Sequence, residues 1–293
     1  MLAGRFPPAR QPDTSLMPPD PVYADLHAHT SCSDGERAPA ELVELAEERG
    51  LRILAVTDHD TVGGVAEAEE AARSRPLAVL TGVELSVTLG GEELHLLAYG
   101  VDPSHSGLTR HLQAMQQVRR ERAWEMIERL RAEGLEVADA RLREQIASTH
   151  AVGRPHVAAA LVRAGHVQSN REAFDRFLGR DGPGFVAKPA FAAEDALGLV
   201  HETGGVGVLA HPGHWTSGRQ VRRLVEAGLD GLETIHPSHD ASLQGYYERL
   251  ARGHDLLVTG GSDYHGRTPE DEERFGRMGL SRADWERFQA ALA

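Results

Sequence analysis

The sequence of 293 residues has one cysteine, Cys32, so an intramolecular disulfide is excluded. It also lacks the run of about 18 apolar residues that a membrane-spanning helix needs. The net charge is −13, from 31 basic and 44 acidic side chains. This balance argues against a general surface for long nucleic acid and leaves only a local basic pocket. Because no apolar leader precedes the first predicted strand, we expect a cytoplasmic protein.

Proline is concentrated at the start of the chain. Residues 1–21 hold six prolines, a density that no helix or central strand tolerates. We therefore interpret residues 1–21 as a flexible arm without a packed structure.

From residue 22 onward, short apolar runs alternate with amphipathic stretches. Strands are expected at 23–27, 51–59, 77–87, 93–100, 206–211, 230–236 and 256–265. Helices are expected at 39–50, 65–74, 193–204, 218–228 and 242–254. This alternation predicts an α/β protein with βαβ units and a parallel sheet. About seven strands favour a closed barrel over an open sheet.

The alternation is interrupted between residues 107 and 190, where no segment is typical of a strand. A long amphipathic helix is expected at 108–134, with shorter helices at 156–165 and 171–179. We predict that residues 22–106 and 191–293 form the barrel and that 107–190 is an inserted helical subdomain for substrate recognition.

Histidine is abundant, with 16 residues, and many lie beside acids where strands are expected to end. The carboxyl ends of barrel strands meet on one face, and residues i and i+2 of a strand point to the same side. Ligands of this kind, without thiolates, indicate a site for divalent metal ions. The residues in question are His27, His29, Asp58, His59, Glu84, His211, Asp263 and His265.

Six short motifs strengthen this interpretation. They are DLHAHTSCSDG (25–35), AVTDHDT (55–61), GVELS (82–86), ELHLLAYG (93–100), LAHPG (209–213) and GSDYHG (261–266). In this order they resemble the PHP (polymerase and histidinol phosphatase) family of metallohydrolases. VGRPHVAAALV (152–162) resembles the branch with a helical insertion, which acts on 3',5'-bisphosphonucleotides or on the 5' ends of short RNA. The resemblance implies a distorted seven-stranded (β/α) barrel with an inserted helical subdomain.

The resemblance also implies three divalent transition-metal ions, manganese being the first choice and iron or zinc the alternatives. One ion would be bound by His27, His29, Glu84 and Asp263. A second would share Glu84 as a bridge, together with His95 and His211. The third would be bound by Asp34, His59 and His265.

The expected chemistry is hydrolysis of a phosphate ester, in which a hydroxide between two ions attacks phosphorus. Glu84, Asp263 and His265 are the expected catalytic residues, although the sequence identifies no general acid. Arg154, at a predicted helix start beside Pro155, is the strongest candidate for binding a second phosphate. His156, His214 and Lys188, the only lysine, are weaker candidates for substrate binding. The other eight histidines are expected to be structural or at the surface: His105, His111, His150, His166, His201, His236, His239 and His254.

The expected partner is a small phosphorylated substrate, such as a bisphosphonucleotide or short RNA, with neither long duplex nucleic acid nor a membrane. Three alternatives stay open: a phosphatase of the histidinol phosphate type, an aminohydrolase-like barrel, and a barrel that binds metal without catalysis. The physiological substrate, the metal in the cell and the oligomeric state are left open by the sequence.

Overall fold

The structure is a computed structural model that describes residues 21–148 and 151–292. The proline-rich arm therefore lies outside the described residues, apart from Pro21, and so does His150. None of the helices in the described ranges combines the length and the apolar character that a membrane span requires.

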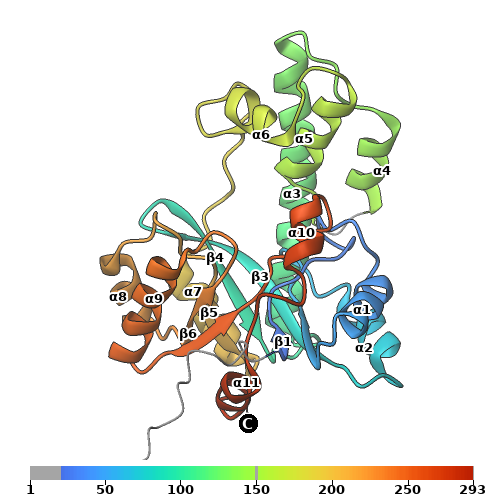
Figure 1. Ribbon diagram of the computed structural model, residues 1–293. Coiled ribbons are helices and arrows are strands. Elements are labelled where there is room, and N and C mark those ends of the chain that lie inside the picture. The colour runs from blue at the N-terminus through green and yellow to red at the C-terminus, as the bar shows by residue number, and fades with distance from the viewer. Residues whose placement is uncertain (1–20, 149–150, 293) are drawn as a thin grey trace, which may run out of the picture.

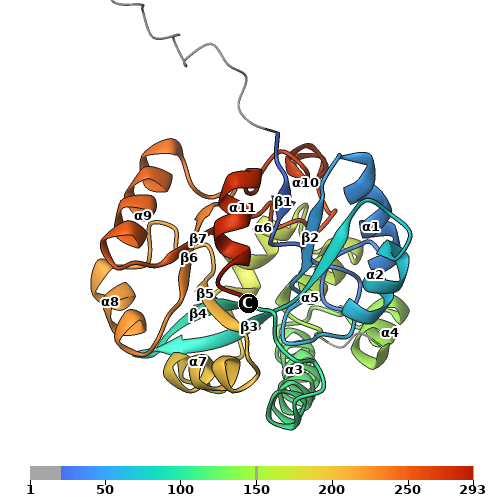
Figure 2. The same ribbon diagram turned by 90° about the horizontal axis from the view of Figure 1, so that it is seen from below.

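Seven strands form one sheet in chain order, and the sheet curls into a nearly closed barrel (Figure 2). The Leu26 amide donates to the Gly260 carbonyl at 3.1 Å, and Ala28 forms a parallel bridge with Tyr264, so the first and last strands approach each other. The predicted seven-stranded barrel is confirmed. The strands are β1 (Ala24–Asp25), β2 (Ile53–Val56), β3 (Ala78–Leu89), β4 (Glu92–Tyr99), β5 (Val206–Leu209), β6 (Gly231–Ile235) and β7 (Leu257–Gly260).

Helices surround the barrel, and α11 lies across its lower end (Figures 1 and 2). There the Phe288 ring packs edge-on against Tyr99, with 5.3 Å between ring centroids. The helices around the barrel are α1 (Pro39–Glu48), α2 (Val65–Ala72), α7 (Ala193–Glu202), α8 (Gly218–Glu226), α9 (Ala241–Gly253), α10 (Pro269–Arg274) and α11 (Arg282–Gln289).

The expectation of a purely parallel sheet is wrong at β4, which runs antiparallel to both β3 and β5. Gly90 and Gly91, with φ of +62° and +89°, join β3 to β4 in a tight turn. Glycine adopts these left-handed angles at little cost, whereas a helical crossover would need a dozen or more residues. The two strands therefore form a hairpin instead of a βαβ unit.

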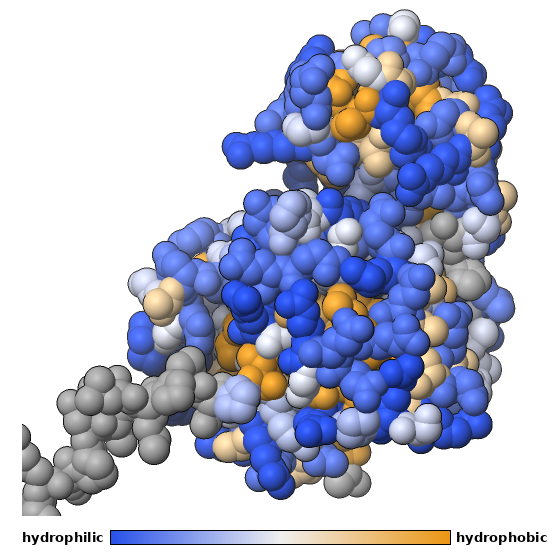
Figure 3. Space-filling view, turned by 45° about the vertical axis from the view of Figure 1, so that its right-hand side comes forward, coloured by the Kyte–Doolittle hydropathy of each residue, from blue (hydrophilic) through white to orange (hydrophobic). Residues whose placement is uncertain are grey.

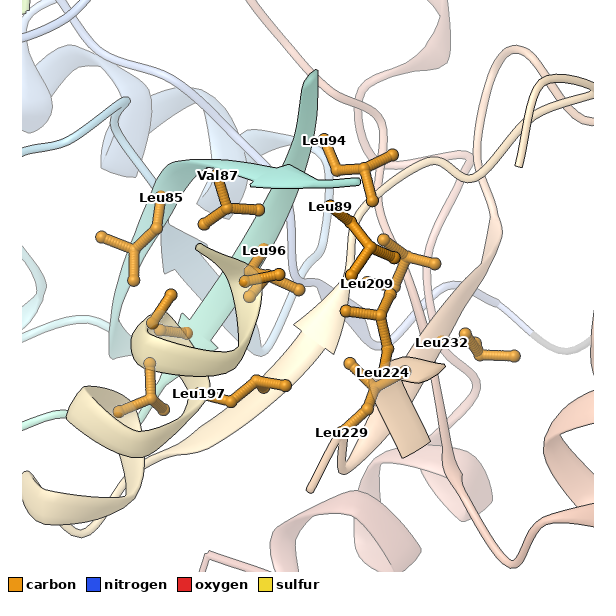
Figure 4. Close-up of a cluster of buried hydrophobic side chains, with 14 of the residues drawn as sticks. Leu85, Val87, Leu89, Leu94, Leu96, Leu197, Leu209, Leu224, Leu229 and Leu232 are labelled. Carbon is orange, nitrogen blue, oxygen red and sulfur yellow. The ribbon is translucent and has the colours of Figure 1, made fainter. Parts of the chain in front are cut away.

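Side chains alternate along β3 and β4 between an apolar outer face and an inner face that carries several polar residues. Leu85, Val87 and Leu89 pack outward with Leu94 and Leu96 against helices α7 and α8 (Figure 4). The residues that alternate with them, which include Glu84, Ser86 and His95, therefore point into the barrel. Burial of the outer leucines, at roughly 1.5–3 kcal/mol per side chain, holds this inner row in register.

A group of helices stands above the barrel (Figure 1) and has a hydrophobic cluster of its own. In the space-filling view, a recess lies between this group and the barrel (Figure 3). The helices are α3 (Ser106–Ala132), α4 (Ala140–Ser148), α5 (Arg154–Arg163), α6 (Asn170–Ala173) and a π-helical turn, η2 (Phe174–Leu178). The proposed boundaries of this subdomain and its role in recognition stay predictions.

Candidate metal centre

The candidate ligands come from the upper end of the barrel, where the loops after the strands meet the helical group. His27 and His29 follow β1, His59 follows β2, and His211 follows β5. His95 lies in the first half of β4, but because β4 is antiparallel its beginning is at this same end. All nine predicted ligands fall within the groups of residues that could hold a metal ion.

The sequence analysis expected Glu84 at the end of its strand, but the structure places it within β3. β3 continues for five residues beyond it, to Leu89, because the hairpin with β4 extends above the barrel rim. His59 forms a parallel bridge with Glu84 at this point, where the loop after β2 runs beside β3. The buried Glu84 side chain therefore lies at the middle of the site, with imidazoles on several sides.

The first group of donors is His27, His29, Glu84 and Asp263. The Nε2 atoms of His27 and His29 lie 3.4 and 3.2 Å from Glu84 Oε2, and 3.3 and 3.2 Å from Asp263 Oδ1. Metal–ligand bonds of about 2.0–2.2 Å bring ligand atoms to such separations around one ion. This set could hold one divalent ion.

The other Glu84 oxygen faces a second pair of imidazoles. Glu84 Oε1 lies 2.7 Å from His95 Nδ1 and 3.0 Å from His211 Nε2, and these two nitrogens are 3.4 Å apart. The two oxygens of one carboxylate thus face different donor sets. This arrangement suits a carboxylate that bridges two ions.

A third group contains Asp34, His59 and His265, with His29 beside them. His265 Nε2 is 3.2 Å from Asp34 Oδ1. Within the described ranges, neither Asp34 Oδ1 nor His59 Nδ1 has a hydrogen bond of good geometry, although His265 Nε2 and Glu84 Oε2 lie 3.2 and 3.0 Å from them. Buried polar atoms are costly without well-aligned partners, and a bound cation would satisfy both.

The electrostatics of the site also suit cations. Burial would raise the pKa of Glu84, but His59, His95 and His27 outweigh it and hold that pKa well below its usual range. Burial lowers the pKa of His95 to about 4 despite Glu84. Burial acts the same way on His29, but Asp263 and Glu84 raise its pKa to about 10. Neighbouring histidines of the site therefore favour different protonation states when no metal ion is bound. Divalent ions would supply the positive charge that balances the carboxylates in place of protons on the imidazoles. Imidazole and carboxylate donors suit Mn, Fe or Zn.

Two further residues belong to this site that the sequence analysis did not assign to it. Glu233, buried on β6, accepts from His27 Nδ1 at 2.9 Å and from the His211 amide at 2.6 Å. His236 Nε2 lies 3.3 Å from Asp263 Oδ2, and it forms a candidate group with His27 and Asp263. The sequence offered a signal in both cases, because DGLETIH was a predicted strand with an acid and a histidine near its end.

A cavity of about 140 Å³, which we call the cationic cavity, lies between the metal centre and the helical group and is lined by several cationic side chains. Its lining combines the ligands Asp34, His59 and His95 with Arg119, Arg122, Arg154 and Lys188. Burial and the neighbouring Arg119 lower the pKa of Lys188 to about 8. Lys188 donates to Ser86 Oγ at 2.8 Å.

Ion pairs and hydrogen bonds hold these cations in place. Arg119 Nε donates to the buried Asp60 at 2.8 Å, which ties α3 to the loop after β2. Arg122 donates to the carbonyls of Ala187 and Val186 and so fixes the segment that carries Lys188.

The other predicted substrate residues lie in different surroundings. Arg154 begins α5, pairs with Glu93 at 3.4 Å, and has its guanidinium within 6 Å of the rings of Phe174 and Phe185. His156 is buried and its Nδ1 accepts from the Gly153 amide at 3.1 Å, which helps to begin α5. His214 is exposed and does not line the cationic cavity.

Comparisons with known proteins agree with this chemistry. The PHP domain family model matches residues 25–178. The chain is 35% identical to a 3',5'-nucleoside bisphosphate phosphatase of Chromobacterium violaceum, over 82% of this chain and 86% of that protein. It is 33% identical to a 5'-3' exoribonuclease of Haemophilus influenzae, over 82% of this chain and 89% of that protein. A solved structure from Bifidobacterium adolescentis, named for metal-dependent phosphoesterase activity, superimposes with a TM-score of 0.84 at 31% identity, covering 93% and 97% of the two chains.

Proposed function

The chain belongs to the PHP family of metal-dependent phosphoesterases, and we propose that it removes or cleaves the 3'-phosphate of a nucleotide that also carries a 5'-phosphate. The simplest such substrate is a 3',5'-bisphosphonucleotide. A short RNA with a 5'-phosphate presents the same two groups at its first nucleotide.

The observation that carries this proposal is the cationic cavity beside the metal centre. Arg119, Arg122, Arg154 and Lys188 line it together with three of the candidate ligands. A single phosphoryl group on the metal ions needs few further cations. Four fixed cations in so small a space instead favour a substrate with a second phosphate close to the first.

The proposed ligands are the nine predicted residues, with Glu84 as the bridge and Glu233 as the group that orients His27. When bound, divalent ions would lower the pKa of a water molecule that attacks phosphorus and would neutralise charge on the phosphoryl oxygens. The chain's own residues orient the substrate. His236 Nε2 lies 3.3 Å from Asp263 Oδ2 and orients this carboxylate. Burial would raise the pKa of Asp263, but His27 and His265 hold it well below its usual range, so we expect Asp263 to be ionised and to serve as a ligand.

Arg154 is the proposed contact for the non-reacting phosphate. Its guanidinium is held near two phenylalanine rings and is paired with a half-buried carboxylate, Glu93, at 3.4 Å. A guanidinium fixed in this way loses little freedom when it grips a phosphate with two hydrogen bonds. Lys188, which lines the same cavity, offers a compact second charge.

The test is metal analysis of the purified protein together with phosphate or nucleotide release from a panel of substrates. The panel contains a 3',5'-bisphosphonucleotide, the matching 3'- and 5'-monophosphates, histidinol phosphate and a 5'-phosphorylated oligoribonucleotide. We expect the highest kcat/KM for substrates with both phosphates. A preference for histidinol phosphate or for a monophosphate would contradict the proposal.

A further inference from the structure

A second groove opens from the metal centre, between the barrel rim and helices α4 and α5. Its volume is about 780 Å³, against about 140 Å³ for the cationic cavity. Asp34, a candidate metal ligand, and Pro155 line both spaces. The groove therefore begins at the reacting centre and leads away from it, and its volume falls in the range of about 300–1,000 Å³ of small-molecule sites.

The lining of this groove suits a sugar–phosphate chain. Ser31 and Ser33 come from the loop after β1, and Asn170 comes from the start of α6. Guanidinium groups are contributed by Arg141, Arg163 and Arg267. Among the described residues that line it, the apolar side chains are small, such as Ala159 and Val162, so a hydrophobic ligand finds little to contact. Guanidinium groups bind phosphate oxygens, and hydroxyl and amide groups bind phosphate and ribose oxygens.

The three arginines differ in how firmly they are held. Arg267 pairs with Asp34 at 3.1 Å, and Arg163 donates two hydrogen bonds to Asp139 at 2.7 and 3.0 Å. Arg141 makes a single contact with Glu36 at 3.3 Å, and both side chains are at least half exposed.

The pair of Arg141 and Glu36 crosses the groove, because Arg141 lies on α4 and Glu36 lies on the barrel loop. An exposed pair of this kind is weak, because water and salt screen it. A phosphate entering the groove can therefore replace Glu36 as the partner of Arg141 at little cost.

We propose that this groove binds the single-stranded oligonucleotide chain that continues from the reacting phosphate, with Arg141 as a backbone contact. The inference rests on the proposed function, because the reacting phosphodiester must lie at the metal centre. The cationic cavity then holds the 5'-phosphate of the first nucleotide, and the following nucleotides leave along α4 and α5.

The experiment compares kcat/KM for a 3',5'-bisphosphonucleotide and for 5'-phosphorylated di- and tetranucleotides, each as the ribo and the deoxyribo form. Arg141→Ala is the test variant. Arg252→Ala is the matched control, because Arg252 lines a different cavity formed with α9 and α11. We expect Arg141→Ala to lower kcat/KM for the tetranucleotide about 10-fold and to leave the bisphosphonucleotide within about 2-fold. The slope of log KM against log salt for the tetranucleotide should fall by about 0.7, as one lost phosphate contact predicts.

The outcomes separate this inference from the proposed function. Hydrolysis of the bisphosphonucleotide without cleavage of either oligonucleotide would overturn the groove and leave the proposed function standing. Equal losses on all substrates in Arg141→Ala would also overturn it.

A third variant, Trp215→Ala, changes an exposed ring beside another groove, near the β3–β4 hairpin. A loss of kcat/KM that grows with oligonucleotide length in Trp215→Ala, with no such loss in Arg141→Ala, would overturn the proposal and assign the oligonucleotide to the other groove. Failure to hydrolyse the bisphosphonucleotide would instead count against the proposed function.

Discussion

The Nε2 atoms of His27 and His29 lie 3.2 Å apart, and both face Glu84 and Asp263. The Glu233 carboxylate accepts from His27 Nδ1, so in the neutral imidazole the proton lies on Nδ1 and the Nε2 lone pair points at the carboxylates. A lone pair that faces anionic oxygens in a buried site is unfavourable, so either a proton or a divalent ion must lie between them. Burial would lower the pKa of His27, but Glu233, Asp263 and Glu84 hold it well above its usual range, and a divalent ion would take the place of that extra proton.

Metal content tests that argument directly. We expect the purified protein to carry about three transition-metal ions per chain. His59→Ala should lower the count and remove most activity, because His59 belongs to two of the candidate groups. Elemental analysis and circular dichroism measure metal content and fold. Full activity in a metal-free preparation would refute the prediction.

Glu233 provides a sharper test, because it contacts ligands and is not counted among them. Glu233→Gln keeps the size of the side chain but removes the charge that orients His27. Losses of outer partners of this type lower metal affinity by about 10- to 100-fold. Competition with a chelator measures the affinity, and activity should return at high metal concentration. An unchanged affinity would show that Glu233 has only a structural role.

The barrel, and the grouping of the nine proposed ligands at one end of it, could be predicted because both depend on local signals. Apolar runs mark the strands, and the short motifs around His27, His59, Glu84 and Asp263 mark their upper ends. The direction of β4 was missed, although Gly90–Gly91 between two apolar runs is a hairpin signal. His236 was set aside because its role depends on its distance from Asp263.

The cationic cavity shows why the rest could not be predicted. Arg119 and Arg122 lie within the long predicted helix at 108–134, and only packing of α3 on the barrel brings Arg119 to Asp60. Lys188 follows a segment without regular structure, and its position depends on hydrogen bonds that Arg122 makes to the backbone. Contacts between such distant segments leave no periodic pattern in a sequence.

The ion pair of Arg119 and Asp60 should contribute to stability. Arg119→Met leaves a buried carboxylate without its partner, and such losses cost about 3–5 kcal/mol. Urea denaturation measures the free energy of unfolding. The double variant Asp60→Asn/Arg119→Met should recover much of the loss, because the buried carboxylate is then uncharged as well. A single variant as stable as the wild type would contradict this expectation.

The same pair should respond to acid. Burial alone would raise the pKa of Asp60, but Arg119 and Lys188 hold it below its ordinary value. The stabilisation is thus fully present above the unfolded-state pKa of about 3.9 and is lost as the pH falls below it. The difference in unfolding free energy between the wild type and Asp60→Asn should therefore shrink below about pH 4. A difference that stays constant down to acid denaturation would argue against it.

Lys188 should give the reaction an alkaline limit. Its pKa is lowered to about 8, so the ammonium group is charged below that pH and neutral above it. If the charge binds phosphate, kcat/KM for a bisphosphonucleotide should fall about 10-fold for each pH unit above the pKa. Lys188→Arg should remove this fall, since a guanidinium stays charged. An identical pH profile in both proteins would assign the limit to another group.

Substrate choice should depend on Arg154. The metal ions require only one phosphoryl group, so selectivity must come from residues that hold the second phosphate. Loss of a charged contact of this kind costs about 2–4 kcal/mol, which corresponds to roughly 30- to 1000-fold in kcat/KM. Arg154→Ala should therefore lower kcat/KM for a bisphosphonucleotide by that factor and barely change the hydrolysis of an aryl phosphate.

The matched control is Arg171→Ala, because Arg171 is also an arginine of the helical group but its side chain is 92% exposed. That variant should behave like the wild type on both substrates. Glu93→Gln provides a second comparison, since it frees Arg154 from its carboxylate partner and should preserve or increase the preference for two phosphates. If Arg154→Ala lowers both activities equally, Arg154 acts on the fold or on the metal ions, and its assignment to the second phosphate would be wrong.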